Sequence, residues 1–424
     1  MSTVDPELHA LRQAATADDP AAWSRLALAL VLRHAMDEAF DWHGRAAARG
    51  HVVSQVELGR MHLHGIAGDV DTAAAVACFE AAEARGFAPA AYYLALVALG
   101  DAALRRDARI DTRLQAAVDA GFAPALRAAA VHYGRRPDPR DQALCVRLMD
   151  AAAQRGDAVA AQLLVARLRN GEGTPADAAA ATRLEQRLAQ AGIAPLPDIV
   201  AMPLGETAVS MPPGRLALED ALLPPRRTTL SERPRVRQVD GLLSSDECRL
   251  LVACARPMLR PSQTVDPDTG QPLRLALRTS DDAAFDPIVE DVALRCVQLR
   301  MAQAADVPLV HAEHLTVLRY APGQEYRPHR DYVPPGAVER DRPDAGNRAR
   351  TICAYLNTVE AGGATEFPVP GLRIAPAPGR AVVFDNLQAD GTPDVDSLHA
   401  GTPVERGEKW LATLWLRERP YRAY

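Results

Sequence analysis

Four residues in the C-terminal half of the chain have the types and the spacing for redox chemistry at a metal. His329 and Asp331 form an H-x-D pair within TVLRYAPGQEYRPHRD, and His399 follows 68 residues after Asp331. Two histidines and one carboxylate are the ligand set of a non-haem Fe(II) centre that leaves metal positions open. Lys409 follows ten residues after His399 and could hold an acidic co-substrate by its charge.

The H-x-D pair needs a β-strand to bring its two side chains together. Successive side chains of a strand point to opposite faces, so His329 and Asp331 would share one face. In a chain with eleven histidines the pair alone is a weak signal. The segment His311-Ala-Glu313-His314 offers a second pair of this kind, and we expect it at the surface or at a strand edge.

Lys409 opens the run KWLATLWL, in which Lys409, Thr413 and Trp415 would share one strand face. A lysine that points inward beside a tryptophan is costly to bury without a partner. A dicarboxylate bound inside the fold would remove that cost. The alternative is a salt bridge from Lys409 to an acidic residue of the protein.

The elements around these residues are short and β-rich. The runs HLTVLRY, RTICAYLNT, ATEFPV, GRAVVFDN and KWLATLWLRE are separated by Gly and Pro, which predicts a sandwich or barrel of the jelly-roll kind. Before them, Ser244 and Glu247 form a capping box that opens a helix over 247–259. A second helix is predicted over 286–304, and the polar segment 263–282 is a candidate flap.

The N-terminal part repeats with a period of 35 or 36 residues, marked by Gly50, Gly86, Gly121, Gly156 and Gly192. Four residues after each of the first four glycines comes a small residue. This period predicts a solenoid of helix pairs, in which each glycine ends a helix and the small residue allows close packing. Such a solenoid either offers a concave surface to a protein partner or only supports its neighbour.

Between the two parts the sequence is dense in proline, with Pro-Pro at 212–213 and 224–225. Proline lacks a backbone donor and restricts the preceding residue, which predicts an extended linker. The predicted fold class is therefore multidomain α + β. A helical repeat solenoid at 1–193 and a linker at 194–235 precede a jelly roll with flanking helices at 236–424.

Composition narrows the functional classes. The 424 residues carry a formal net charge of −6, which favours neither a nucleic-acid binder nor a membrane-surface protein. The N-terminus lacks the apolar segment of a signal peptide, and no apolar run approaches a membrane span. Six scattered cysteines without a CxxC pair predict free thiols in a reducing cytoplasm.

Two resemblances follow from these motifs. Residues 236–420 resemble the 2-oxoglutarate- and Fe(II)-dependent dioxygenases of the prolyl 4-hydroxylase type. The matching segments occur in family order: RTS at 278–280, LRYAPGQEYRPHRDY at 318–332, RTICAYLNTVEAGGATEFP at 350–368 and HAGTPVERGEKWLATLWLRE at 399–418. The N-terminal repeats resemble Sel1-like repeats, a branch of the tetratricopeptide superfamily. The first resemblance implies a double-stranded β-helix that uses Fe(II), 2-oxoglutarate and O₂, with ascorbate as a further candidate cofactor.

The dioxygenase resemblance also assigns roles to single residues. It implies that His329, Asp331 and His399 ligate Fe(II). Lys409 would pair with the distal carboxylate of 2-oxoglutarate, helped by hydrogen bonds from Tyr320 and Thr365.

For the substrate, the resemblance implies that Trp415 lines the pocket. Arg348 lies where the family carries an arginine that touches substrate, and Arg350 is the alternative because the preceding loop varies in length.

The implied reaction is hydroxylation of a prolyl residue in a protein or peptide, with the repeats helping to recruit it. Two alternatives stay open at this point. The same chemistry could act on another side chain, a free amino acid or a small metabolite. The chain could also be a non-catalytic interaction scaffold, although all four essential positions are intact.

Overall fold

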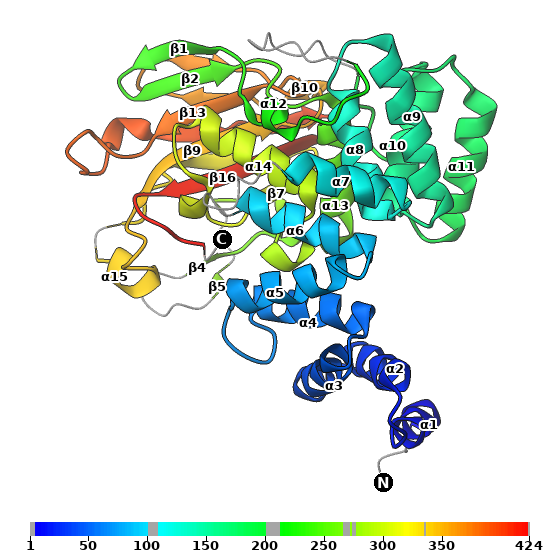
Figure 1. Ribbon diagram of the computed structural model, residues 1–424. Helices are drawn as coiled ribbons and strands as arrows, with labels where there is room; N and C mark the ends of the chain where they lie inside the picture. Colours follow the sequence, from blue (N-terminus) through cyan, green and yellow to red (C-terminus); the bar gives the residue numbers. More distant parts are fainter. Residues whose placement is uncertain are drawn as a thin grey trace. The chain divides into compact units, whose positions relative to one another are not determined.

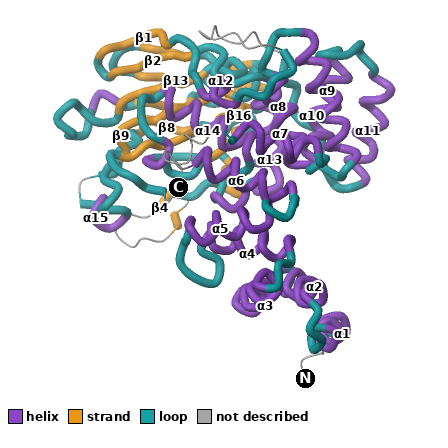
Figure 2. Tube along the Cα trace, viewed as in Figure 1, coloured by secondary structure: helices purple, strands orange, loops and turns teal. Residues whose placement is uncertain are grey.

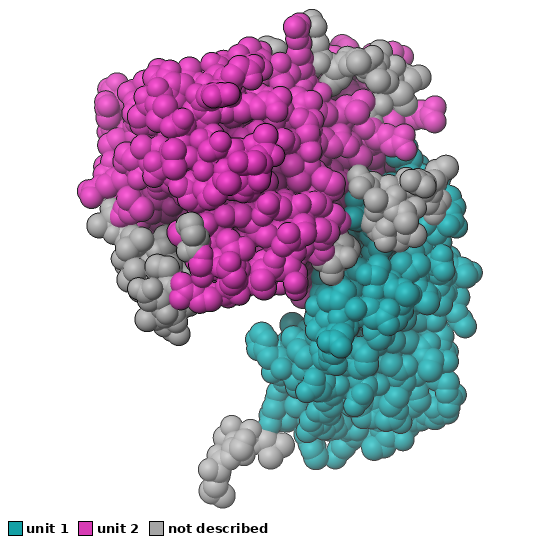
Figure 3. All heavy atoms as spheres, turned by 90° about the vertical axis from the view of Figure 1, so that its left-hand side faces the viewer, with its two compact units in different colours: residues 1–125 teal, residues 126–424 magenta. Residues whose placement is uncertain are grey.

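The computed structural model describes residues 5–100, 109–200, 213–265, 272–273, 277–334 and 336–422. The chain divides into two compact units, Met1–Ala125 and Leu126–Tyr424, which Figure 3 shows in different colours. The predicted flap at 263–282 lies partly outside the described residues. No helix in the described part of the chain is long and apolar enough to cross a membrane.

The first unit consists of helices that follow the sequence period. They are α1 (Pro6–Ala14), α2 (Pro20–Val31), α3 (Met36–Ala48), α4 (Val52–His64), α5 (Thr72–Glu83), α6 (Ala88–Gly100) and α7 (Ile110–Asp119). Several of them begin at an aspartate. The side chains of Asp19 and Asp71, for example, accept hydrogen bonds from backbone N–H groups of the first helical turn.

The second unit opens with the remaining repeat helices. They are α8 (Ala123–Gly134), in which the division between the units falls, α9 (Pro139–Gln154), α10 (Ala158–Asn170) and α11 (Ala178–Gln190).

The periodic glycines and small residues have the predicted roles. All five glycines have positive φ angles, between 73° and 87°, which is the left-handed conformation of a helix C-terminal cap. The small residues that follow them are fully buried, and these are Ser54, Ala90, Ala125 and Ala160. The predicted helical repeat is therefore confirmed.

The rest of the second unit contains two antiparallel sheets with helices against the larger one (Figures 1 and 2). The large sheet has the order β1 (Arg227–Glu232), β2 (Arg235–Val239), β13 (Ala381–Asp385), β9 (Arg348–Tyr355), β16 (Lys409–Arg417), β7 (Thr316–Tyr320), β6 (Asp281–Ala284) and β3 (Arg260–Pro261). The small sheet has the order β12 (Leu372–Ile374), β11 (Thr365–Phe367), β14 (His399–Gly401) and β8 (Tyr326–His329). Two short pairs complete the strands: β10 (Ala361–Gly362) with β15 (Val404–Arg406), and β4 (Thr264–Val265) with β5 (Pro272–Leu273).

The two sheets enclose one hydrophobic core. Tyr355, Val382 and Leu411 of the large sheet pack in one cluster with Phe367 and Ile374 of the small sheet. The helices α13 (Ser245–Ala255) and α14 (Val292–Ala304) pack against the large sheet, so β16 is buried on both faces. The predicted jelly roll with flanking helices is confirmed.

Two details differ from the sequence interpretation. The strand β1 begins at Arg227, inside the segment predicted as linker, and pairs with β2. The short strands β8 and β14 contain the two predicted ligand histidines, but Asp331 lies two residues beyond the end of β8 rather than on the strand. The predicted capping box at the start of α13 is present.

Buried ion pairs join the repeat helices of the second unit to α13 and α14. Glu247 of α13 accepts from Arg135 at 2.5 Å and from Arg300 of α14 at 2.8 Å. Beside it, Asp246 pairs with Arg167 of α10. All five side chains are nearly inaccessible to solvent, so each charge depends on its partner for stabilisation.

We expect Glu247→Ala to lower the free energy of unfolding by about 3–5 kcal/mol, because it leaves two buried guanidinium groups without their carboxylate. Urea denaturation followed by circular dichroism measures this. The control is Glu185→Ala, which removes an exposed pair with Arg169 and should cost less than about 1 kcal/mol. Equal losses for the two variants would contradict the structural importance of this cluster.

Candidate metal and co-substrate site

The two predicted ligand histidines face each other across the small sheet. In the antiparallel pair β14–β8, His399 lies opposite His329, and their ring centroids are 4.3 Å apart. Asp331 joins them: its Oδ1 lies 3.5 Å from Nε2 of His329 and its Oδ2 lies 3.8 Å from Nε2 of His399. One potential ligand atom from each residue fits within 4.8 Å of the other two.

Backbone carbonyl groups orient both rings. Nδ1 of His329 donates to the carbonyl of Arg327 at 2.8 Å, and Nδ1 of His399 donates to that of Ser397 at 3.0 Å. Because a carbonyl only accepts, Nδ1 carries the proton in each ring. The lone pair is then on Nε2, directed at the space shared with Asp331.

The charges at the triad also suit a cation. Burial alone would raise the pKa of Asp331, but His399, His329 and Arg348 hold it well below its usual range. Burial, with a smaller effect of His329, lowers the pKa of His399 to about 4. At neutral pH the site therefore presents an ionised carboxylate and a neutral His399, the protonation states in which these groups ligate metals.

Two further residues support the triad, and the sequence interpretation gave them no role there. The Thr351 hydroxyl donates to Oδ2 of Asp331 at 2.8 Å and accepts from the amide of Asn386 at 2.9 Å. Both side chains are fully buried. This leaves Oδ1 of Asp331 as the oxygen available for a metal. The alternation of Thr351, Cys353 and Tyr355 along β9 was a signal for inward-facing positions.

Lys409 is buried in the same sandwich. It lies opposite Tyr320 in the pair β16–β7, and its Nζ is 5.3 Å from the Tyr320 ring and 5.6 Å from the Tyr355 ring. In the described part of the chain no carboxylate forms an ion pair with Lys409, which has 2% exposure. The alternative of a structural salt bridge is therefore wrong for these residues. Burial lowers the pKa of Lys409 to about 8.

Thr365 lies on β11 and is buried. Its hydroxyl accepts a hydrogen bond of 2.7 Å from the Tyr355 hydroxyl, so its own proton is free to be donated to a ligand. Tyr355 was not among the predicted site residues. Burial raises the pKa of Tyr320 above its usual range, so this phenol stays a neutral donor.

The two arginine candidates have different environments. Arg348 has its guanidinium 4.4 Å from the centroid of the Trp415 ring, and its Nη1 is 3.4 Å from the carbonyl oxygen of Asp331. Arg350 instead pairs with Asp385 at 2.9 Å and donates to the carbonyl of Ala305. The structure thus brings Arg348 and Trp415, but not Arg350, to the triad.

The segment 311–314 lies at a strand edge, one of its two expected positions, because Ala312 bridges Leu416 and the N–H of Glu313 donates to the carbonyl of Trp415. The Glu313 side chain is not at the surface: it is buried, with 9% exposure, and pairs with Arg348 at 2.7 Å and with Arg417 at 2.6 Å. These arginines stabilise an acidic side chain that the sequence pattern alone could not place in the interior.

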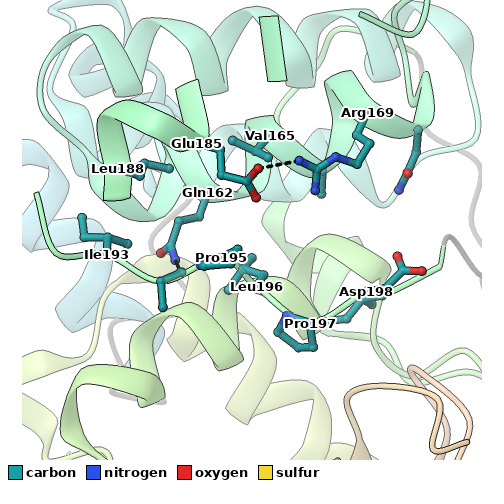
Figure 4. A pocket seen from close by; sticks show the side chains of 14 residues that line it. Gln162, Val165, Arg169, Glu185, Leu188, Ile193, Pro195, Leu196, Pro197 and Asp198 are labelled. Carbon is teal, nitrogen blue, oxygen red and sulfur yellow. Dashed lines mark hydrogen bonds and ion pairs between the residues drawn. The ribbon is translucent and has the colours of Figure 1, made fainter. Parts of the chain in front are cut away.

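A separate pocket of about 230 Å³ lies between α10, α11 and the segment 193–199 (Figure 4). Figure 4 shows the ion pair of Arg169 with Glu185, which is 2.7 Å long, and the apolar side chains of Ile193, Pro195 and Leu196. None of the residues that line this pocket is a predicted site residue.

Comparison with known proteins agrees with this geometry. The family described as the 2OG-Fe(II) oxygenase superfamily matches residues 315–417. "Probable prolyl 4-hydroxylase 3" of Arabidopsis thaliana is 35% identical over 212 residues, which cover 46% of this chain and 72% of the relative. The chain belongs to the prolyl 4-hydroxylase family. It is a 2-oxoglutarate-dependent dioxygenase, as the sequence predicts, and the family implies Fe(II), 2-oxoglutarate and O₂.

Solved structures with similar parts include a viral collagen prolyl hydroxylase from Paramecium Bursaria Chlorella virus-1 in complex with 2-oxoglutarate. It is 27% identical, covers 43% of this chain and 95% of its own, and has a TM-score of 0.35. A Sel1 repeat protein from Oxalobacter formigenes is 22% identical, covers 41% of this chain and 74% of its own, and has a TM-score of 0.36. The family assignment depends on the sequence relatives.

We expect Thr351→Val to weaken Mn(II) binding by about 10- to 100-fold, the usual effect of losing a hydrogen bond that orients a metal ligand. Isothermal titration with Mn(II) under nitrogen measures this without turnover. Thr413→Val is the matched control, because Thr413 is also buried in the sandwich but its hydroxyl contacts the thiol of Cys353, at 3.6 Å, and not a residue of the triad. Equal Mn(II) affinity in the two variants would show that Thr351 does not support the site.

We expect Lys409→Met to weaken 2-oxoglutarate binding about 10- to 100-fold, because a charged hydrogen bond contributes about 1.5–3 kcal/mol. The thermal midpoint should not fall, since the substitution removes a buried charge. Titration of Mn(II)-loaded protein measures the Kd, and an unchanged Kd would rule out Lys409 as the anchor.

The same titration has an expected pH dependence. Lys409 is cationic below its pKa of about 8 and loses its proton above it, so affinity for the dicarboxylate should fall as the pH rises through 8. Lys409→Arg stays charged and should remove this dependence.

Proposed function

We propose that this chain hydroxylates a prolyl residue within a protein or peptide and couples this to decarboxylation of 2-oxoglutarate. The observation that supports this most strongly is the buried Lys409, which has no ion pair with any carboxylate that the structure describes and lies in the same sandwich as the triad of His329, Asp331 and His399. A buried cation beside a metal-ligand set suits a small anion that must also reach the metal. The prolyl target is supported by the family and by the names of its members.

The described side chains fit Fe(II). The Nε2 atoms of His329 and His399 and the Oδ1 atom of Asp331 would hold the metal and leave positions for co-substrate and O₂. When bound, iron and 2-oxoglutarate supply an oxidant from O₂, with succinate and CO₂ as co-products and one oxygen atom inserted into a C–H bond of the substrate.

The residues around Lys409 would hold the distal carboxylate of 2-oxoglutarate. The ammonium supplies the charge, and the Thr365 hydroxyl supplies a donor because Tyr355 already satisfies its acceptor. Tyr320 lies opposite Lys409 in the strand pairing and would add a neutral donor. Phe384 and Phe367, whose ring centroids lie 4.5 and 5.5 Å from His399, keep water from the inner side of the site.

The substrate would bind beside Arg348 and Trp415. The indole Nε1 of Trp415 is buried and has no hydrogen-bond partner among the described residues. An unsatisfied donor next to the triad suits a carbonyl oxygen of a peptide.

Three finer points belong to the same proposal. The helical repeats recruit the protein substrate through the surface that such arrays present. Ascorbate is a candidate cofactor on the family resemblance alone. The six cysteines are all free thiols, which supports a reducing, cytoplasmic location.

The test is succinate release by protein loaded with Fe(II) under nitrogen and then exposed to O₂, with and without a library of proline-rich peptides. We expect peptide-stimulated, iron-dependent succinate and a peptide one oxygen atom heavier at proline. His329→Ala should abolish both signals. Stimulation by a free amino acid or by a peptide modified at another residue would replace the prolyl target, and no succinate at all would favour the scaffold alternative.

The same assay tests whether the helical repeats of the first unit recruit the protein substrate or only support the fold. Removal of residues 1–125, the first compact unit, should raise the KM for a long protein substrate more than for a short peptide. Equal KM values with and without this unit would contradict recruitment by the first unit.

A further inference from the structure

Glu313 forms a buried bridge that the proposed chemistry does not yet explain. Its Oε1 accepts from Nε of Arg348 at 2.7 Å and from Nε of Arg417 at 2.6 Å, and its Oε2 accepts from Nη2 of Arg348 at 2.8 Å. Arg417 continues to Asp341 at 2.6 Å. We call these four residues the Glu313 bridge. Since both carboxylate oxygens are engaged by guanidinium groups, Glu313 is not available as a metal ligand.

The bridge fixes the plane of the Arg348 guanidinium. Two of its three nitrogens donate to Glu313, and the flat group lies over the Trp415 ring at 4.4 Å. The third nitrogen, Nη1, is 3.4 Å from the carbonyl oxygen of Asp331. The side chain of Arg348 is 25% exposed, and Nη1 is the one guanidinium nitrogen that does not donate to Glu313.

Arg417 in turn fixes Glu313. It is buried, with 3% side-chain exposure, and its Nη1 donates to the carbonyl of Gly346 at 3.0 Å. Its other partner, Asp341, is the last residue of α15 (Val338–Asp341) and is 47% exposed. The bridge therefore extends from a surface segment to the guanidinium beside the triad.

We propose that Glu313 is a positioning residue for the substrate. It holds Arg348 so that Nη1 donates to a main-chain carbonyl oxygen of the bound peptide, next to the residue that is hydroxylated. This inference rests on the proposed peptide substrate. A bidentate arginine–carboxylate pair is directional, and an arginine fixed before the substrate arrives loses less conformational freedom on binding than a free one.

The bridge also explains why a second arginine is needed. With Arg348 alone, a buried carboxylate would be only partly compensated. Arg417 completes its compensation and leaves Nη1 of Arg348 unshared with Glu313. The bridge therefore stabilises the carboxylate and keeps one donor available.

The test compares Glu313→Gln with the matched control Glu247→Gln. Glu247 is likewise a buried glutamate held by two arginines, but on α13. We expect Glu313→Gln to raise the KM for the stimulating peptide about tenfold, the effect of one weakened charged hydrogen bond, with a smaller change in kcat. The Kd of 2-oxoglutarate should be unaltered in both variants, and Glu247→Gln should leave the peptide KM unchanged.

A second readout does not need the substrate. Because Arg348 stacks on Trp415, releasing it should change the fluorescence of Trp415, identified by subtracting the spectrum of the Trp415→Phe background from the signal of the four tryptophans. We expect this change in Glu313→Gln and not in Glu247→Gln.

The outcomes are distinguishable. If Glu313→Gln changes neither the peptide KM nor the Trp415 spectrum, the positioning role is overturned. If the spectrum changes but no peptide stimulates the wild-type protein, Glu313 positions Arg348 as inferred and the proposed peptide substrate fails. If Glu313→Gln does not fold, Asp341→Asn at the exposed end of the bridge is used. It should raise the peptide KM about two- to threefold, as expected for a partly exposed pair, and an unchanged KM and spectrum there would overturn the role.

Discussion

The site depends on one energetic constraint, the cost of enclosing a lysine between two sheets when no carboxylate of the described segments pairs with it. Strand pairing fixes the position of Lys409. The strand β16 is hydrogen-bonded to β7 on one side and to β9 on the other, and Lys409 lies opposite Tyr320. The rings of Tyr320 and Tyr355 lie near its Nζ, and they attract an ammonium weakly without neutralising it. The fold thus keeps a buried cation whose electrostatics would improve if an anion were bound beside it, as proposed for 2-oxoglutarate.

The triad of His329, Asp331 and His399 has an excess charge of the opposite sign. There the excess charge is negative, and hydrogen-bond donors act on it together with the charges of the neighbouring His399, His329 and Arg348. Thr351 engages one oxygen of Asp331, and Asn386 holds Thr351. The nearest cation, Arg348, is already committed to Glu313 by two hydrogen bonds. Asp331 forms no ion pair with Arg348, and its second oxygen would be left for a metal. The positive charge of Lys409 and the negative charge at the triad together indicate where a chelating dicarboxylate would lie.

How much of the fold and of the site could be predicted depended on whether the interactions are local in sequence or join distant segments. Strands, capping box and helical repeats follow from local patterns, and these were predicted. The ligand residues could be proposed because H-x-D is local and His399 precedes a recognisable strand. The features that depend on tertiary contacts could not be predicted. The register that places His399 opposite His329, the hydrogen bond from Thr351 and the burial of Glu313 all depend on strands distant in sequence. The strand β1 was missed because its proline-rich surroundings favour a linker, whereas pairing with β2 decides its structure.

The same reasoning applies to the repeats of the second unit. The ion-pair partners of Arg135 and Arg167 lie outside the repeats: they are Glu247 and Asp246 on α13. A buried arginine separated from its carboxylate would be strongly destabilised, so these helices and the sandwich stabilise each other. The first unit has no part in this ion-pair cluster, whose members all lie beyond residue 125. It follows that the last repeat helices complete the interior on which α13 is built, so this part of the repeat array has a structural role.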